Sequence, residues 1–175
     1  MITRQEALDA VRRAGCSEQV VEHLLAVERT ALSIAKKVQA RGHKIDLKRV
    51  RLGSLLHDIG RAKTHGIAHG VEGGKILKEM GLDDFVAFAE RHIGAGLPAA
   101  EAKELGLPAR ALIPKTIEEK VVTYADKLVM GNRRVSYKRA FEMFRDDLGR
   151  NHPALKRFEN LHKVIERLSV GTKSS

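Results

Sequence analysis

Residues that can bind a metal ion are concentrated in one short stretch of the sequence. The segment from Leu55 to Gly74 contains His57, His65 and His69, three of the chain's 8 histidines, together with Asp58. Neutral imidazole and carboxylate groups suit zinc, iron, manganese, nickel or cobalt. The chain has a single cysteine, which excludes a zinc cluster made of thiolates. We therefore expect that nitrogen and oxygen atoms hold any metal in this protein.

Further ionisable side chains lie on the apolar faces of predicted helices. His23 lies within the apolar stripe of one helix, His92 follows a phenylalanine by one turn, and Asp126 follows a valine by one turn. A single buried histidine is more often a satisfied core residue than a ligand. With His57, however, four ionisable groups come from four separate helices, and one metal site would satisfy them together. The spacing does not determine the number of ions.

Asp126 gives the strongest reason to expect a cation. An unpaired ionised carboxylate is costly in an apolar environment, and no lysine or arginine lies one turn away on the inward face of its helix. Lys127 is adjacent, but neighbouring residues on a helix point about 100° apart. We therefore expect Asp126 to face a metal rather than a lysine.

Helices are expected to position these residues. Capping residues and apolar periodicity predict helices over about 3–15, 17–41, 46–57, 71–80, 83–92, 116–128, 136–149 and 153–168. The Gly/Pro/Ala-rich residues 93–108 are expected to form a loop with one or two helical turns, and no strand alternation is evident. The predicted fold class is all-α, a single-domain helical bundle over residues 1–175.

Composition limits the partners. The chain is 43% hydrophobic and lacks an apolar run of the roughly 20 residues that span a membrane. It begins with an amphipathic segment unlike a signal peptide. We therefore expect a cytoplasmic protein without a membrane partner. Its net charge of +10 favours anionic partners, although a solvated basic exterior is equally compatible. Five Phe, two Tyr and no Trp provide few stacking platforms, which favours a small phosphorylated substrate over nucleic acid. The sequence does not determine the oligomeric state, and a monomer and a homodimer are both compatible with it.

The order of these residues resembles the HD superfamily of metal-dependent phosphohydrolases. A histidine on one helix (His23), the doublet His57-Asp58 and a distant aspartate (Asp126) follow the family pattern, and residues 57–60 read HDIG. The resemblance implies that these four residues hold a first metal ion. It also implies an HD core over about residues 17–135. The C-terminal helices, 136–169, are expected to pack on this core, with a dimer contact as the alternative.

Two further histidines are similar to those of the phosphodiesterase-type members. These members use two histidines between the doublet and the final aspartate to bind a second ion, and the matching residues are His69 and His92. The resemblance therefore implies one or two divalent transition-metal ions (Fe, Mn, Ni, Co or Zn), with Asp58 bridging a pair. His65 is expected to be an exposed loop residue.

The resemblance implies hydrolysis of a phosphate ester by a metal-activated water. Asp58 would bridge the ions, and Arg61 and Lys127 could contact a substrate oxygen. Small HD proteins with two extra histidines are similar to enzymes that cleave small phosphodiesters or cyclic phosphates, including the cyclic phosphodiesterase of methanopterin synthesis. The sequence Gly96-Leu97-Pro98 replaces the Gly-Tyr-Pro of the cyclic-di-GMP phosphodiesterases and argues against that substrate.

Four alternatives stay open. The protein could be a nucleotide phosphomonoesterase, a non-catalytic HD regulatory module that binds metal, or a nucleic-acid-binding protein. Some HD relatives perform oxygen chemistry at a di-iron centre. The basic residues that flank the ligand pattern favour phosphate.

Overall fold

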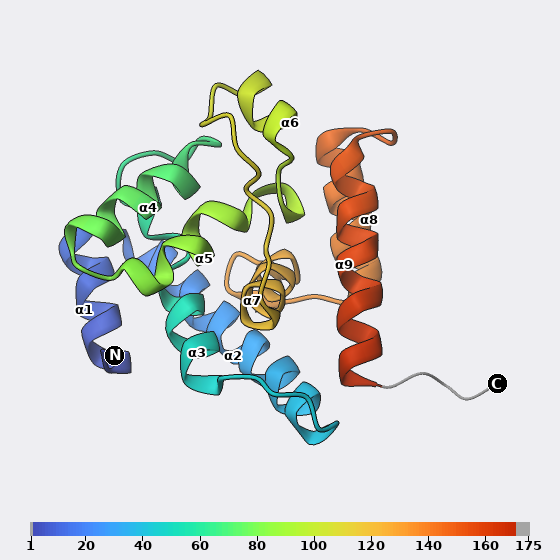
Figure 1. Cartoon of the computed structure of the whole chain (residues 1–175), viewed down its shortest axis with the longest axis horizontal. Coiled ribbons are helices and arrows are strands. Elements are labelled where there is room, and N and C mark those ends of the chain that lie inside the picture. Colours follow the sequence, from blue (N-terminus) through green and yellow to red (C-terminus); the bar gives the residue numbers. More distant parts are fainter. Residues whose placement is uncertain (1, 171–175) are drawn as a thin grey trace.

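Helices dominate the computed structural model, which describes residues 2–170 (Figure 1). The chain therefore has the predicted all-α fold. Its elements are α1 (Arg4–Ala14), α2 (Glu18–Ala40), α3 (Leu47–Leu56), η1 (Ile59–Ala62), α4 (His69–Glu79), η2 (Asp83–Phe85), α5 (Val86–Arg91), η3 (Ile93–Ala95), α6 (Ala99–Glu104), α7 (Ile117–Lys127), β1 (Val129–Met130), β2 (Arg133–Arg134), α8 (Tyr137–Leu148) and α9 (Pro153–Ser169). The short elements η3 and α6 are the helical turns expected within residues 93–108.

Side-chain caps start the first three helices where the sequence predicts them. Thr3 and Glu6 form a reciprocal capping box at the start of α1. Ser17 accepts a hydrogen bond from a backbone N–H of α2, and Asp46 accepts two from α3. Each cap satisfies N–H groups that have no partner within their own helix.

A small β-hairpin departs from the prediction that the chain has no strands. Residues Val129–Met130 of β1 pair with Arg133–Arg134 of β2 in antiparallel register. Strands of two residues are too short to show the alternation by which a strand is identified in a sequence. Gly131 in the connecting turn has a φ of 59°, a left-handed conformation that glycine adopts at little cost.

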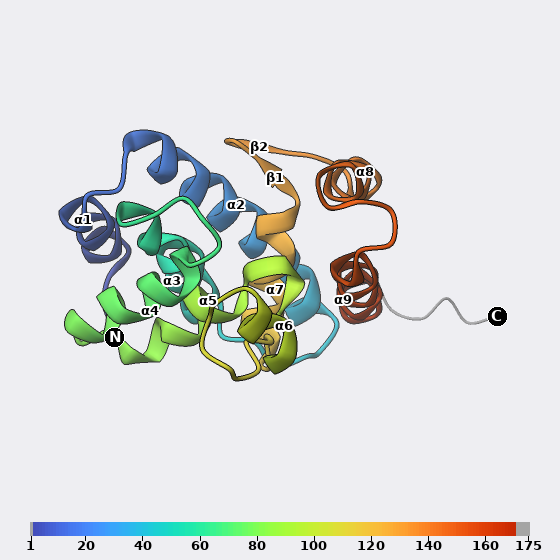
Figure 2. The same cartoon turned by 90° about the horizontal axis from the view of Figure 1, so that it is seen from above.

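One main hydrophobic core joins the N-terminal and C-terminal helices. The apolar stripe of α2 is buried as its spacing predicts, through Val20, Leu24, Val27, Ala31, Ile34 and Val38. Phe158, Leu161 and Ile165 on α9 belong to the same core. The α8–α9 pair lies at one end of the molecule in both views (Figures 1 and 2). Neither α2 nor any other helix within residues 2–170 is long and apolar enough to cross a membrane.

Candidate metal centre

Six predicted ligand residues from five helices meet in one cluster. They are His23 on α2, His57 and Asp58 after the end of α3, His69 at the start of α4, His92 after the end of α5, and Asp126 near the end of α7. The His57 and Asp58 residues are 0% and 1% exposed. The structure therefore brings together all the residues predicted to hold metal, and it places most of them away from bulk water.

Glycines allow these helix ends to approach one another closely. A Cβ atom on Gly53 would overlap the ring of Phe88, and a Cβ atom on Gly60 would overlap the carbonyl oxygen of His69. Gly53 therefore permits the contact of α3 with α5, and Gly60 permits the contact of η1 with α4. Gly53 and Gly60 thus permit the close packing that positions the histidines.

Backbone carbonyl groups orient all four imidazole rings. The Nδ1 atoms of His23, His57, His69 and His92 lie 2.8 Å from the carbonyl oxygens of Gly131, Ser54, Gly66 and Ala89, respectively. A carbonyl oxygen can only accept, so each Nδ1 carries the hydrogen. Each neutral ring then presents the lone pair of Nε2 to the cluster. This is the usual arrangement for histidines that bind metal.

Three of the side chains form a first group. Oδ1 of Asp126 lies 3.1 Å from Nε2 of His23 and 3.4 Å from Nε2 of His57. Bonds of about 2.0–2.2 Å to a shared zinc-like ion would separate the ligand atoms by about 3–3.5 Å. The spacing of this group fits one ion.

A second group surrounds Asp58. Its Oδ1 atom lies 3.0 Å from Nε2 of His69 and 3.3 Å from Nε2 of His92. Its Oδ2 atom faces the first group, 3.9 Å from Nε2 of His23. Asp58 therefore lies between the two groups with one oxygen directed to each, as a bridging carboxylate would.

Two buried ligand atoms lack a hydrogen-bond partner among the described residues. They are Nε2 of His57 and Oδ1 of Asp58. Leaving a buried polar atom unsatisfied costs about 1–3 kcal/mol. A divalent cation would satisfy both atoms, and the nitrogen and oxygen donors suit a transition metal. The residues present therefore fit a metal ion.

Burial and neighbouring charges shift the pKa values of the cluster. Burial lowers the pKa of His92 to about 4, although Asp58 opposes the shift. Burial opposes ionisation of Asp58, but the surrounding imidazoles outweigh it and hold the pKa of that carboxyl well below its usual value. The pKa of Asp126 is likewise far below its usual value, because Lys127 and two histidines outweigh burial. At neutral pH these groups are in the forms that bind metal.

The two predicted phosphate-contacting residues both pair with carboxylates of the cluster. Arg61 donates from Nε to Oδ2 of Asp58 at 2.5 Å, and Lys127 donates from Nζ to Oδ2 of Asp126 at 2.7 Å. The expectation that Lys127 points away from Asp126 is wrong. α7 ends at Lys127, and a long flexible side chain at a helix end can fold back toward its neighbour.

The cluster opens to solvent through a hollow of about 370 Å³. Its lining includes His23, Asp58, Arg61, His65 and Gly131. His65 is exposed, as expected for a loop residue, and lies at this opening. Sequence reasoning missed Gly131, because a turn glycine carries no signal that its carbonyl group will orient a distant histidine.

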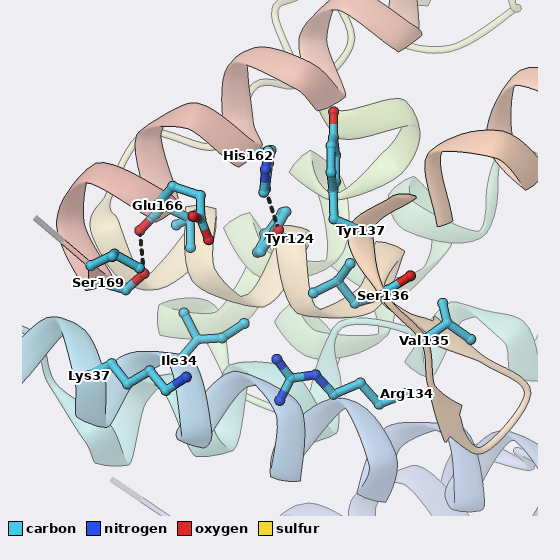
Figure 3. Close-up of a pocket in the computed structure, with 13 residues that line it drawn as sticks. Ile34, Lys37, Tyr124, Arg134, Val135, Ser136, Tyr137, His162, Glu166 and Ser169 are labelled. Carbon is cyan, nitrogen blue, oxygen red and sulfur yellow. Dashed lines mark hydrogen bonds between the residues drawn. The ribbon is translucent and has the colours of Figure 1, made fainter. Parts of the chain in front are cut away.

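A separate hollow of about 440 Å³ lies between α2, α7 and α9, and none of the six cluster residues lines it (Figure 3). A hydrogen bond of 2.6 Å joins the Tyr124 hydroxyl to Nδ1 of His162, and the Tyr137 ring stacks on His162 at 3.5 Å. His162 is therefore partly buried, with the rings of Tyr124 and Tyr137 stacked against it.

One family model matches more than half of the chain. The sequence model described as "HD domain" matches residues 20–131. An uncharacterized protein of Methanocaldococcus jannaschii is 50% identical over 154 residues, which cover 87% of this chain and 91% of that protein. No solved structure matches the chain significantly.

Two further relatives have RNA-related names. A tRNA (cytidine(56)-2'-O)-methyltransferase of Thermoplasma volcanium is 39% identical over 162 residues, which cover 92% of this chain and 46% of that protein. A ribonuclease Y of Pseudothermotoga lettingae is 28% identical over 145 residues, which cover 79% of this chain and 28% of that protein. The chain thus spans less than half the length of each of these two proteins.

Proposed function

The chain belongs to the HD domain family, and from that premise we propose that it is a metal-dependent phosphohydrolase that cleaves a small phosphodiester or cyclic phosphate. HD domains bind divalent metals, and the cluster offers two groups of nitrogen and oxygen ligands, one around Asp126 and one around Asp58. The position of Asp58 between the groups is the observation that carries the proposal.

Each group has a distinct role in this proposal. His23, His57 and Asp126 would hold one ion, His69 and His92 would hold a second, and Asp58 would contribute to both. Divalent iron, manganese, nickel, cobalt or zinc bound there would polarise a phosphoryl oxygen and lower the pKa of a water molecule.

The cationic residues beside the cluster would help to bind the phosphate. Arg61 lines the opening, and only its Nε–H is bonded to Asp58. Its remaining N–H groups are available to a substrate oxygen, since a guanidinium has five donors. Lys127 has two further donors besides the one bonded to Asp126. Both residues would therefore offset the negative charge of a phosphoryl group without leaving their carboxylates.

A paired measurement of metal and activity tests the proposal. Wild-type protein should contain close to two ions per chain and hydrolyse bis(4-nitrophenyl) phosphate or a cyclic nucleotide. The isosteric variant Asp58→Asn should lose activity by about a hundredfold or more and retain its helical circular dichroism. Asp147→Asn, at an exposed position, is the matched control and should behave as wild type. Full activity of Asp58→Asn would contradict the proposal.

The metal content also separates the alternatives. Close to one ion per chain, with activity on monoesters, would favour a mononuclear nucleotide phosphomonoesterase. A value near zero after metal has been offered would favour a regulatory module without turnover.

A phosphodiester within RNA is a second candidate substrate. The net charge of +10 favours it, and so do the relatives whose names concern tRNA and a ribonuclease. Cleavage of a short RNA oligonucleotide, with binding that weakens steeply as salt is raised, would support this candidate. Methyl transfer is not proposed, because the chain spans only 46% of the methyltransferase.

A further inference from the structure

An apolar groove of about 600 Å³ lies between α6, the C-terminal end of α8 and the N-terminal end of α9. In Figure 1, α6 lies beside the upper ends of α8 and α9. Its apolar lining includes Ile67, Leu97, Leu105, Phe144, Leu148 and Pro153. This volume lies within the range of sites that bind small molecules, about 300–1,000 Å³, and such sites are lined mainly by apolar side chains.

Exposed apolar side chains gather at this groove. Ile67, Leu105 and Leu148 are 43%, 43% and 38% exposed, and all three line it. Only two other large hydrophobic residues in the described part of the chain, Ile113 and Val170, are comparably exposed. Single exposed hydrophobic residues are ordinary, whereas a contiguous group indicates a binding surface.

One short segment of the chain contributes to both the groove and the opening of the metal cluster. His65 lines that opening and Ile67 lines the groove, so the segment 65–67 separates the two hollows. On the other wall, Gly94 follows the cluster residue His92 by two positions. A ligand that crosses the segment 65–67 would therefore contact both hollows.

The charges of the two hollows differ. Arg61 lines the opening of the cluster, whereas the described residues that line the groove include no lysine or arginine. Glu101 and Glu104 line the groove, and Glu101 accepts two hydrogen bonds of 2.8 Å from Arg157. Because Arg157 neutralises Glu101 and the described lining residues supply no free cation, the groove offers a phosphate no partner, so an uncharged part of a ligand suits it.

We propose that this groove binds an aromatic ring of the substrate whose phosphoryl group lies at the metal cluster. The inference rests on the proposed function. The lining includes the aromatic side chain of Phe144 and the apolar rings of Pro98 and Pro153, against which such a group can pack. Residues from Phe144 to Ala154 lie outside the segment 20–131 matched by the family model. The groove would therefore determine which substrate this chain selects among those that the HD site can hydrolyse.

Two phosphonates test the groove without requiring turnover. Calorimetric titration of the Mn²⁺-loaded protein would compare methylphosphonate with 4-phenylbutylphosphonate, which carries a ring on a flexible linker. The ring should strengthen binding by about ten- to a hundredfold, the gain expected from burying one aromatic side group. Leu105→Asp should abolish this gain and leave the affinity for methylphosphonate unchanged. Ile113→Asp, at a residue 39% exposed and outside the groove, is the matched control and should retain the gain.

Several outcomes would overturn the inference. Equal affinity for the two phosphonates would contradict it, and so would no binding of either. An equal loss of the ring's contribution in Leu105→Asp and Ile113→Asp would also contradict it. Gel filtration would reveal another occupant, since a wild-type dimer that Leu105→Asp dissociates would mean that a second copy covers the groove. A preserved preference for the ring, without hydrolysis of any ester, would support the groove and contradict the proposed function. Hydrolysis of a cyclic phosphate without a preference for the ring would do the reverse.

Discussion

The Nε2 atoms of His69 and His92 lie 3.1 Å apart within the buried cluster. Both rings bond a backbone carbonyl group through Nδ1, so in the neutral rings two lone pairs face each other. This arrangement is unfavourable unless a cation lies between the nitrogens. Oδ1 of Asp58 lies 3.0 Å and 3.3 Å from the same two atoms. It completes a group of three atoms that can each donate a lone pair to a metal ion.

His92→Ala should reduce the metal content from close to two ions per chain to close to one. His23, His57 and Asp126 remain to hold the other ion, since their ligand atoms lie within 4.8 Å of one another. Elemental analysis of untagged protein purified without chelator measures the change. His43→Ala, at an exposed position, should leave the content unaltered. Two ions in both variants would show that His92 is not a ligand.

Gly60→Ala should destabilise the fold and weaken metal binding together. The added methyl group would overlap the carbonyl oxygen of His69 and crowd the backbone nitrogen of Gly73, neither of which can move without shifting α4. Overpacking of this kind costs about 1–3 kcal/mol or more. Urea unfolding and metal titration measure the two effects.

The matched control is Gly66→Ala in the neighbouring loop. A Cβ atom there would meet only the Thr64 hydroxyl oxygen, at 3.5 Å, an ordinary contact. The unfolding free energy of this variant should stay close to that of wild type. If Gly60→Ala were equally harmless, the close approach of η1 and α4 would not position His69.

Tyr124→Phe should lower the unfolding free energy by about 1 kcal/mol, because it removes the 2.6 Å hydrogen bond to His162. Tyr124 lines the hollow shown in Figure 3, which none of the six cluster residues lines. The metal content should therefore be unchanged. Tyr137→Phe is the control, since it keeps the ring that stacks on His162. If the two variants had the same urea midpoint, the hydrogen bond would make no contribution to stability.

The buried thiol of Cys16 should make stability depend on pH in the alkaline range. Burial raises its pKa from the usual 9.0 to about 11, and Sγ donates to the carbonyl oxygen of Ile59 at 3.4 Å. The folded protein thus holds this proton to a higher pH than the unfolded chain. The stabilisation is fully present below pH 9 and is lost as the pH rises toward 11.

Unfolding free energies of wild type and Cys16→Ala between pH 8 and pH 11 measure this effect. Wild type should lose more stability than the variant over the range from 9 to 11. Parallel curves would contradict the prediction. Iodoacetamide at pH 8 should label the thiol only after unfolding, because the thiol is 9% exposed.

Local interactions made much of the fold predictable. The caps at Thr3, Ser17 and Asp46 act within one helical turn, and the apolar stripe of α2 is a repeat along a single element. Four of the six cluster residues, His23, His57, His92 and Asp126, were identifiable as ionisable groups on apolar faces, and the resemblance to the HD family added Asp58 and His69. In contrast, a hairpin of two-residue strands leaves no periodic pattern to detect.

The sequence by itself determined the helices, their caps and the identities of the residues that converge. Only the tertiary structure decided how these residues are used. It directs one oxygen of Asp58 to each ligand group, brings Lys127 back onto Asp126, and orients His23 through a carbonyl group 108 residues away at Gly131. Caps and periodicity depend on neighbours within a few residues, whereas these contacts depend on how closely distant elements pack. The glycines between those elements permit that approach, and its geometry exists only in the folded chain.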